Sequence, residues 1–296
     1  MSLFPGGLEL DISGLPERLH LGTSSFSSAD WVGPFYPLGS RPADFLGEYA
    51  ARLRTVEIDA TWHALPAIKT VESWARRVPD HFVFSLKVPK TISHELYLEG
   101  CEEEWTEFLR ALEPLGAKRG PLVLQFPYVS KQQSPEEWET GADFCRRLAR
   151  FLPLVPKDVR LVVEVRNDHW VAEPLLDLLR KHGAALALVE YYTMPSGPTV
   201  LEQVDAITSD FAYARLLGNH REMDLMVAKA RQEGLRKGDW ESLIVDREAE
   251  TRAWVPAVQS LLGRNLDVFV YFNNHFAGFA PGSLDLFLRC WRDGVA

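Results

Sequence analysis

A pair of opposite charges lies near the end of one apolar run of the chain. Residues 160–170 read RLVVEVRNDHW, and Glu164 and Arg166 stand two positions apart in this stretch. In an extended strand both side chains point to the same side of the sheet. A carboxylate placed in this way can transfer protons, and a guanidinium can hold an anion through its planar fork. A structural ion pair is the alternative, so the interpretation depends on what surrounds the two residues.

Similar polar residues close most of the other apolar runs. Those able to ionise or to form hydrogen bonds at these ends are Glu57, Asp59, Lys87, Gln125, Glu190, Arg215, Asn273 and Asn274. Charges in a protein interior must be paired or must meet a ligand, because the burial of an isolated charge is costly. We therefore expect one shared charged floor, in which cations face carboxylates, rather than an isolated pair. The members of this floor are Lys87, Arg166, Arg215, Glu57, Asp59 and Glu164.

Binding of a small anion, combined with proton transfer, is the chemistry predicted for this floor. Lys87, Arg166 and Arg215 would hold a phosphate or a carboxylate. Glu57 and Glu164 would serve as general acid and base if their pKa values are driven apart. Permanent pairing of the cations with the carboxylates is the alternative. The other residues predicted to contact the ligand are His94, Gln125, Asn273 and Asn274.

Histidines and aromatic residues follow the same strand ends and leave further alternatives open. The histidines just beyond these ends are His63, His94, His169 and His275. With Asp59, Glu164 and Glu190 they could hold a divalent metal, but the sequence has no HExxH pattern or other tight ligand spacing. We therefore assign no cofactor and no metal ligand. The aromatic residues, which could stack on sugar rings or simply pack together, are Trp31, Phe35, Tyr36, Trp62, Tyr128, Trp170, Tyr191 and Phe276.

The elements that must position these residues are eight short apolar runs separated by helix-like stretches. The runs cover residues 19–24, 55–61, 81–88, 121–126, 160–166, 184–192, 211–218 and 267–274. Helices are predicted over residues 43–53, 68–78, 101–116, 134–152 and 172–183. The helix over 134–152 would begin with Ser134 as its cap and Pro135 in its first position.

Eight strands that alternate with helices indicate a single (β/α)8 TIM-like barrel, in which the chemistry sits at the carboxyl ends of the strands. A doubly wound sheet is the weaker alternative, because the GxGxxG and Walker A patterns are absent. The pattern predicts an N-terminal extension over residues 1–18 and a barrel domain over residues 19–296. A long, charged segment follows the seventh strand, from Asn219 to Arg252. It could form a lid over the barrel mouth or a solvated surface excursion.

The composition is that of a water-soluble globular protein. Of the 296 residues, 46% are hydrophobic and 25% are charged, which suffices for a sizeable core. The formal net charge of −9 disfavours non-specific binding to nucleic acid, although a local basic pocket is compatible with it. The three cysteines are scattered, the N-terminus lacks a secretory pattern, and no apolar run approaches the roughly 20 residues of a membrane span. We expect a cytoplasmic protein without membrane contact, and the sequence predicts no oligomeric state.

Seven sequence blocks follow one another along the chain. They are LGTSSF with WVGPFYP (31–37), FLGEYAARLRTVEIDATW (45–62), SWARRVPDHFVFSLKVPKTISH (73–94), GPLVLQFP (120–127), VEVRNDHW (163–170), ARLLG (214–218) and VYFNNHFAGFA (270–280). In this order they resemble the YecE-like family, the domain of unknown function seventy-two, over roughly residues 19–290. The resemblance implies a TIM-barrel-like fold and brings no established activity.

Two positions depart from the pattern of that family. The family often has Phe-Tyr where this chain has Trp62-His63, and a histidine where this chain has Leu217. A mechanism that needed this histidine would require His63 or His220 to replace it here.

Together these patterns predict an enzyme that binds a small anionic, sugar-like or phosphorylated substrate at the barrel mouth. A hydrolase or an isomerase that uses carboxylate acid/base chemistry would fit this description. One alternative is a metal-assisted phosphodiesterase acting on nucleic acid. The other is a non-catalytic, metabolite-binding barrel.

Overall fold

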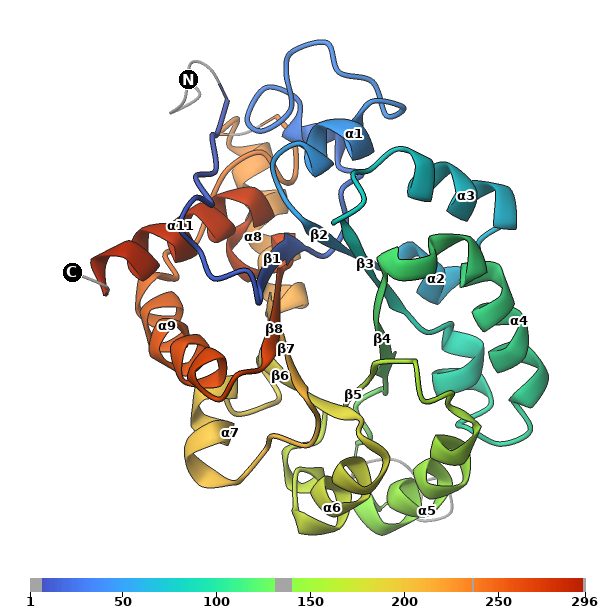
Figure 1. Cartoon of the computed structure of the whole chain (residues 1–296). Coiled ribbons are helices and arrows are strands. Elements are labelled where there is room, and N and C mark those ends of the chain that lie inside the picture. The colour runs from blue at the N-terminus through green and yellow to red at the C-terminus, as the bar shows by residue number, and fades with distance from the viewer. Residues whose placement is uncertain (1–6, 131–139, 236, 295–296) are drawn as a thin grey trace.

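Eight parallel strands form the centre of the molecule. A computed structural model describes residues 7–130, 140–235 and 237–294. The strands are β1 (Leu19–Thr23), β2 (Thr55–Ile58), β3 (Val83–Lys87), β4 (Arg119–Gln125), β5 (Leu161–Glu164), β6 (Ala185–Tyr191), β7 (Phe211–Gly218) and β8 (Asp267–Phe272). They pair in the order β1-β8-β7-β6-β5-β4-β3-β2, and Figure 1 shows them inside a ring of helices. The predicted (β/α)8 barrel is confirmed.

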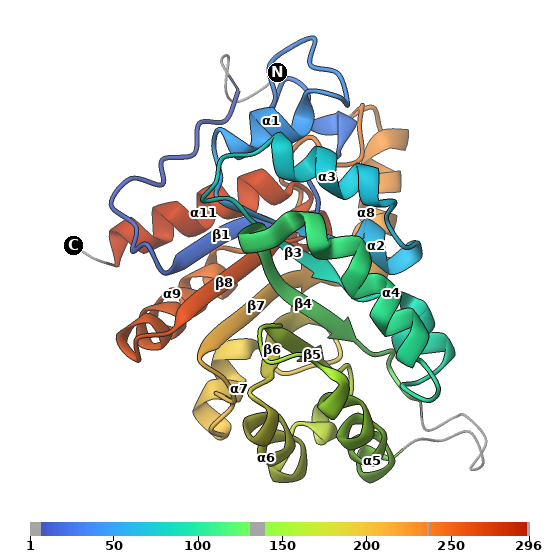
Figure 2. The same cartoon turned by 45° about the vertical axis from the view of Figure 1, so that its right-hand side comes forward.

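The helices cover the outside of this barrel (Figures 1 and 2). Their bounds are α1 (Phe45–Ala50), α2 (Ala60–His63), α3 (Ile68–Arg76), α4 (Glu102–Leu112), α5 (Gly141–Phe151), α6 (Glu173–His182), α7 (Gly197–Gln203), α8 (His220–Gln232), α9 (Glu248–Gly263), α10 (Asn274–Ala277) and α11 (Ala280–Asp293). Among the described residues, no helix is both long enough and apolar enough to cross a membrane.

Local sequence signals explain several helix boundaries. Gly183 ends α6 in the left-handed conformation, with φ 64°, as the His182-Gly183 pair predicts. The helix predicted over 134–152 begins as α5 after Thr140, which forms a capping box with Asp143. The proposed cap Ser134 and the following Pro135 lie outside the described residues.

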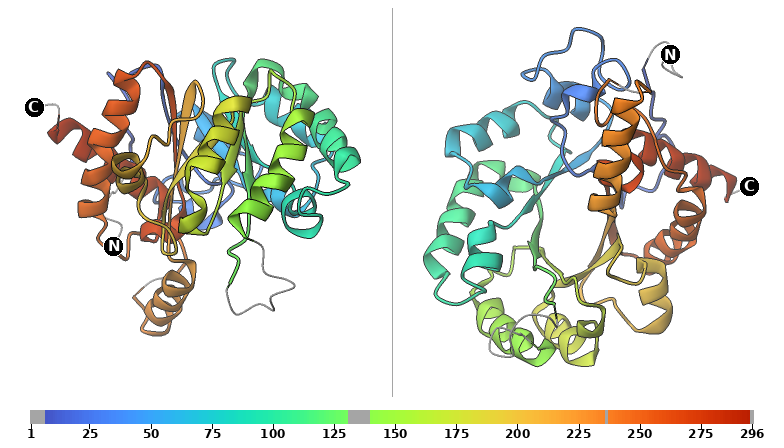
Figure 3. Two further views of the ribbon diagram at one scale, coloured as in Figure 1. Left: turned by 90° about the horizontal axis from the view of Figure 1, so that it is seen from below. Right: turned by 180° about the vertical axis from the view of Figure 1, so that it is seen from behind.

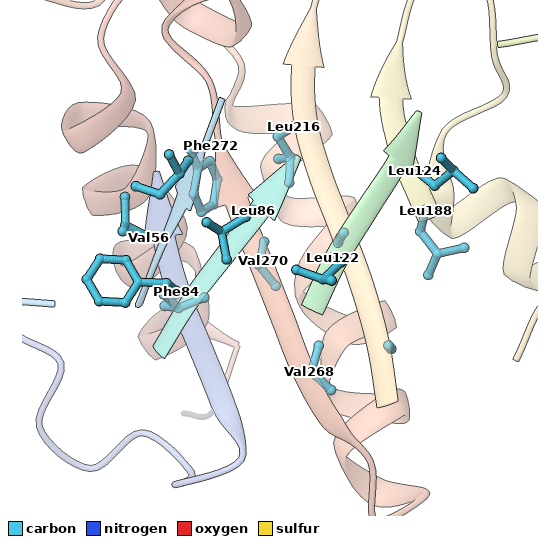
Figure 4. Close-up of a cluster of buried hydrophobic side chains, with 14 of the residues drawn as sticks. Val56, Phe84, Leu86, Leu122, Leu124, Leu188, Leu216, Val268, Val270 and Phe272 are labelled. Atoms are coloured by element: carbon cyan, nitrogen blue, oxygen red, sulfur yellow. The ribbon is translucent and has the colours of Figure 1, made fainter. Parts of the chain in front are cut away.

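Two clusters of apolar side chains, one on each face of the strands, hold the barrel together. The outer cluster fills the space between strands and helices, and Figure 4 shows part of it, including Val56, Leu86 and Val270. The inner cluster includes Val162 and Phe269 and fills the lower part of the barrel. Because successive residues of a strand face opposite sides, strands β4 to β8 contribute buried residues to both clusters. The barrel interior is therefore apolar over much of its length and polar at the carboxyl ends of the strands.

The segment after β7 contains the extra structure that the sequence predicts. Helix α8 projects beyond the ring of helices at one end of the barrel (Figure 3). The following loop is attached to the rest of the protein by Asp30, whose Oδ2 accepts hydrogen bonds from the backbone N–H groups of Asp239 and Trp240 at 2.9 and 3.1 Å. Its movement as a lid stays a prediction.

Closure of the barrel between β1 and β2 depends on a close approach of the two backbones. Outside the regular pairing, Ser24 and Glu57 form an isolated parallel bridge at this seam. A Cβ atom on Gly22 would lie 2.4 Å from the carbonyl oxygen of Thr55 and 3.0 Å from Cε1 of Tyr271. Only glycine leaves room for this approach.

We therefore expect Gly22→Ala to lower the free energy of unfolding by about 1–3 kcal/mol, because the added methyl group forces the seam apart. Gly47→Ala in α1 is the matched control, since nothing lies within 4 Å of a Cβ at that position. It should leave stability unchanged or raise it by up to about 1 kcal/mol. Urea denaturation of both variants tests this, and equal midpoints would contradict the proposed constraint.

Candidate functional site

A cavity of about 450 Å³ opens at the carboxyl ends of the strands. Strands β2 to β8, or the residues directly after them, all contribute to its wall. The lining residues are Asp59, Trp62, His63, Lys87, His94, Gln125, Pro127, Tyr128, Arg166, Tyr191, Arg215, Leu217, His220 and Asn273. The place is the one where a TIM-like barrel carries its chemistry.

Arg215 occupies the centre of the cavity floor and is 2% exposed. Its Nη1 donates to Oε2 of Glu164 at 2.6 Å, and its Nη2 donates to Oε1 of Glu57 at 2.6 Å. Nη2 also lies 3.4 Å from Oδ1 of Asp59. Because the three partners come from β5, β2 and the turn after β2, the guanidinium connects opposite sides of the barrel. The shared charged floor that the strand pattern predicts is present.

Glu57 and Glu164 form the buried side of this charged floor and do not line the cavity. Both are 0% exposed, and neither is among the lining residues. Glu57 also accepts a hydrogen bond from the hydroxyl of Tyr213 at 2.6 Å, and that hydroxyl lies 2.6 Å from Oγ of Ser85. Glu57 is therefore held by the Tyr213 hydroxyl as well as by Arg215, whereas Glu164 pairs with Arg166 and Arg215.

The surroundings of Glu164 keep it ionised. Burial by itself would raise the pKa of Glu164, but the positive charges of Arg166 and Arg215 outweigh burial and lower this pKa to about 2. A carboxyl group of this kind is a poor proton carrier near neutral pH. Its placement favours a role as counter-ion to the two arginines over the acid/base role predicted from the sequence.

Asp59 is the carboxylate that faces the cavity. Its side chain is 32% exposed, and Oδ1 lies 3.8 Å from Nζ of Lys87. Burial and the nearby charge of Glu57 raise the pKa of Asp59 to about 6, against the opposing effect of Lys87 and Arg215. A carboxyl group with this pKa exchanges protons readily near neutral pH. The sequence placed Asp59 only in the charged floor, because nothing in the alternation distinguishes it from Glu57.

Lys87 and Gln125 form the next part of the wall. Nζ of Lys87 donates to Oε1 of Gln125 at 3.3 Å and lies 5.1 Å from the centre of the Trp62 ring. Burial lowers the pKa of Lys87, and the charge of Asp59 opposes this effect. The lysine side chain is 12% exposed, so its ammonium group has little contact with solvent.

Arg166 lies beside this pair and is 7% exposed. Its Nη2 pairs with Oε1 of Glu164, and its guanidinium lies 3.7 Å from the centre of the Tyr191 ring. Within the described part of the chain, Nε and Nη1 of Arg166 are buried and have no hydrogen-bond acceptor. Buried cationic donors without an acceptor are costly, so an anion in the cavity would stabilise this side chain.

Three histidines line the cavity: His63, His94 and His220. Nδ1 of His94 lies 2.7 Å from Oγ of Ser93. Burial and neighbouring positive charges lower the pKa values of His94 and His220 to about 4, so both rings are neutral at physiological pH. Leu217, which replaces the histidine of the family pattern, also lines the cavity. His63 and His220 thus line the same cavity as Leu217.

The two asparagines after β8 have different positions. Asn273 lines the cavity, and its Oδ1 accepts a hydrogen bond from the backbone N–H of His275 at 2.9 Å. Asn274 is not among the lining residues, and its Oδ1 accepts a hydrogen bond from the backbone N–H of Ala280 at 2.9 Å. Asn274 thus holds the start of α11, which does not favour the ligand contact predicted for it.

The residues considered for a metal site are dispersed. Glu190 faces α9, where its Oε2 accepts a hydrogen bond from Nε1 of Trp254 at 2.9 Å. His169 pairs with Asp168, and Nε2 of His275 lies 3.1 Å from Oδ1 of Asp224. In the described ranges, no three His, Cys, Asp or Glu side chains are grouped to hold a metal ion.

The aromatic residues near the strand ends divide between cavity and core. Trp62, Tyr128 and Tyr191 line the cavity. The others are at most 3% exposed and pack in the core, as Trp31, Phe35, Tyr36, Trp170 and Phe276 do. The sequence signal for the lining residues, an aromatic ring just beyond a strand end, also occurs at the buried positions and so could not separate the two groups.

Comparisons with known proteins give a family and a fold. Residues 20–294 match the sequence model of a family described as "Protein of unknown function DUF72". The UPF0759 protein YecE of Escherichia coli strain K12 is 31% identical over 156 residues, which cover 52% of this chain and 51% of that protein, so the match spans about half of each. The UPF0759 protein YunF of Bacillus subtilis strain 168 is 22% identical over 91% of this chain and 100% of that protein. A crystal structure of a DUF72 family protein from Thermotoga maritima MSB8 shares the fold, with a TM-score of 0.70, 24% identity, and coverage of 93% of this chain and 99% of that one.

The buried floor predicts that Glu164→Gln lowers the free energy of unfolding by about 3–5 kcal/mol, because Arg166 and Arg215 then lose a buried counter-charge. Asp177→Asn on α6 is the control, since its ion pair with Arg180 is solvent-exposed and should contribute less than about 1 kcal/mol. Chemical denaturation measures both changes. A loss for Glu164→Gln as small as that of the control would show that the floor is not energetically important.

The surroundings of Asp59 predict that its carboxyl group titrates near pH 6. Carbon-13 NMR of the side-chain carboxyl can follow this titration, and the signal that disappears in Asp59→Asn identifies the residue. The ordinary pKa of an aspartate is 3.8, so between about pH 4 and 6 the folded state keeps a proton that the unfolded chain has released. The contribution of Asp59 to stability is therefore greatest below pH 4 and falls as the pH rises to about 6. Lys87→Met should raise the pKa further, because Lys87 stabilises the ionised form. A midpoint near 3.8 would refute this account.

Proposed function

This chain belongs to the DUF72 family of proteins of unknown function, and we propose that its barrel mouth binds a small anionic metabolite that is sugar-like or phosphorylated. We further propose that the protein is an enzyme that moves a proton on this metabolite. The arguments come from the charge of the cavity wall, from its neutral hydrogen-bonding groups, and from Asp59.

The distribution of charge between wall and floor is the observation that carries the proposal. Lys87, Arg166 and Arg215 line the cavity, and Asp59 is the only carboxylate among the lining residues that the structure describes. Glu57 and Glu164, which would neutralise the cations, lie below them and are fully buried. The side that a ligand meets is therefore positive, although the whole chain carries a net charge of −9. Such a wall attracts anions.

The rest of the wall suits a polar metabolite with hydroxyl groups. Gln125, Asn273 and neutral His94 offer hydrogen-bonding groups without adding charge. The rings of Trp62 and Tyr128 supply apolar surface on which the carbon face of a sugar can rest. A cavity of about 450 Å³ lies in the range of small-molecule sites.

In this proposal, Asp59 takes over the acid/base role that the sequence assigned to Glu57 and Glu164. It is the carboxyl group that reaches the ligand, and its pKa of about 6 allows it to accept and to release a proton near neutral pH. The two glutamates then act indirectly, because they hold Arg215 and Arg166 in place.

A thermal-shift screen tests the proposal. The panel holds sugar phosphates, carboxylated metabolites, free sugars and short oligonucleotides. A ligand of the folded state at about 100 times its dissociation constant adds roughly 2.7 kcal/mol of stability. We expect small anions to stabilise the wild-type protein. In Arg166→Ala, with each thermal shift measured against the ligand-free variant, the affinity for the same anion should be at least tenfold lower than in the wild type.

Two variants control for side effects of this substitution. Arg166→Lys keeps the charge but not the planar fork, and Arg150→Ala removes an arginine of α5 that is 76% exposed. The second should bind as the wild type does. Absence of stabilisation by any anion, or equal affinity in Arg166→Ala, would overturn the proposal. Binding without conversion of the ligand would favour the non-catalytic, metabolite-binding barrel.

A further inference from the structure

Lys87 differs from an ordinary structural lysine in its contacts. Its Nζ lies 3.3 Å from Oε1 of Gln125 and 3.8 Å from Oδ1 of Asp59, so its ion pair with Asp59 is long. Lys90, three residues further along, contacts Oε1 of Glu95 at 2.7 Å. Lys118 donates to two backbone carbonyl oxygens at 2.8 and 3.0 Å. A lysine whose only role was to neutralise a charge would be expected to make a contact of this kind.

The groups around Lys87 explain why its ion pair with Asp59 is long. Arg215 pairs with both Glu57 and Glu164, and Arg166 also pairs with Glu164. The two buried carboxylates therefore have arginine partners rather than Lys87. Asp59 is shared between Lys87 and Arg215. The Trp62 ring lies 5.1 Å from Nζ, and neither it nor His94, which lines the same cavity, adds a negative charge.

This environment makes the ammonium form of Lys87 less stable than that of an exposed lysine. Burial disfavours the ammonium form, and the positive charge of Arg215 acts in the same direction, so the pKa of Lys87 is lowered although Asp59 opposes the shift. An uncharged amine has a free lone pair and is a nucleophile towards carbonyl carbon. Its position at the end of β3 directs it into the cavity, where the lysine stem is packed and only 12% of the side chain is exposed.

We propose that Lys87 is a nucleophile that forms an imine with a small aldehyde or ketone carrying a phosphate or carboxylate group. This inference rests on the proposed anion site and extends it, because it names the substrate class and the residue that bonds to the substrate. Arg166 holds the anionic group, and the carbonyl carbon then lies towards Lys87 and Asp59.

Asp59 supplies the proton transfers that this reaction needs. The Nζ lone pair attacks the carbonyl carbon, the C=O π bond breaks, and a proton moves from nitrogen to oxygen through the Asp59 carboxyl group, which gives a neutral carbinolamine. The hydroxyl group then leaves as water with a proton from Asp59, and the nitrogen lone pair forms the C=N bond. The products are a protonated imine, one water molecule and the Asp59 carboxylate. No oxidant or reductant takes part.

The first test measures the reactivity of Lys87 without any specific ligand. The folded protein is treated at pH 7 with formaldehyde and cyanoborohydride, and the methylation of each lysine is followed over time by peptide mass spectrometry. Lys157 is the reference, because it is exposed and lies just before β5, at the end of the barrel opposite to the cavity. We expect Lys87 to be methylated faster than Lys157, because burial and the charge of Arg215 lower the pKa of Lys87 and so raise its neutral fraction. Methylation of Lys87 no faster than that of Lys157 would overturn the proposal.

The second test traps the imine itself. The protein is incubated with glyceraldehyde 3-phosphate, dihydroxyacetone phosphate or pyruvate, reduced with borohydride and digested, and the adduct is located by mass spectrometry. We expect an adduct on Lys87 with at least one of these probes. Lys87→Arg, which keeps the charge, should abolish it, and Lys157→Arg should leave it unchanged. Adducts spread over the surface lysines, or retained in Lys87→Arg, would refute a specific imine.

The two proposals fail in different ways. If anions stabilise the protein through Arg166 but Lys87 is unreactive, the imine is wrong and the anion site stands. If Lys87 is reactive and neutral carbonyl compounds are trapped as efficiently as anionic ones, the anion site is wrong and the nucleophile stands. Measurements of binding in Lys87→Arg, beside trapping in Arg166→Lys, separate these cases.

Discussion

The structure depends on one buried interaction, the contact of Arg215 with Glu57 and Glu164 across the barrel. Burial of a guanidinium that is 2% exposed is costly, and two fully buried carboxylates 2.6 Å from its nitrogen atoms offset this cost. These carboxylates, in turn, need the guanidinium. Because the three side chains belong to β7, β2 and β5, none of these strands can shift without breaking the contact. The ion cluster therefore fixes the relative positions of strands that do not pair with one another.

The same constraint produces the polarity of the cavity. The carboxylates of Glu57 and Glu164 are buried in ion pairs and do not reach the cavity. Lys87, Arg166 and Asp59 are the charged side chains that line it beside Arg215. Permanent ion pairing and anion binding are thus compatible, because ion pairing applies to the buried carboxylates and anion binding to the side chains that line the cavity. A layer of hydroxyl groups from Ser85 and Tyr213 supports the cluster from beneath and separates it from the apolar core.

The cavity wall is also where this chain departs from the pattern of the family to which it belongs. Leu217 of β7 lines the cavity at the position where the resemblance suggests a histidine, while His63 lines it from the end of α2 and His220 from the start of α8. Trp62 precedes His63 and packs against His94, with ring centres 5.1 Å apart. Since the fold and the ion cluster do not depend on these positions, such changes can alter the ligand that is accepted without disturbing the barrel.

The alternation of apolar runs and helices was enough to predict the barrel, and the two-residue period of a strand was enough to place Lys87, Arg166 and Arg215 on one side. Both are local properties of the chain. The depth of each side chain along the barrel axis was not predictable, because it depends on the stagger of strands such as β4 and β5, where Gln125 stands beside Glu164. The sequence order already places Asp59 nearer the carboxyl end than Glu57, but only the tertiary structure decided that the cavity reaches Asp59 and not Glu57. The same reason separates Asn273 from Asn274, since the chain turns into α10 between them and no periodicity extends through a turn.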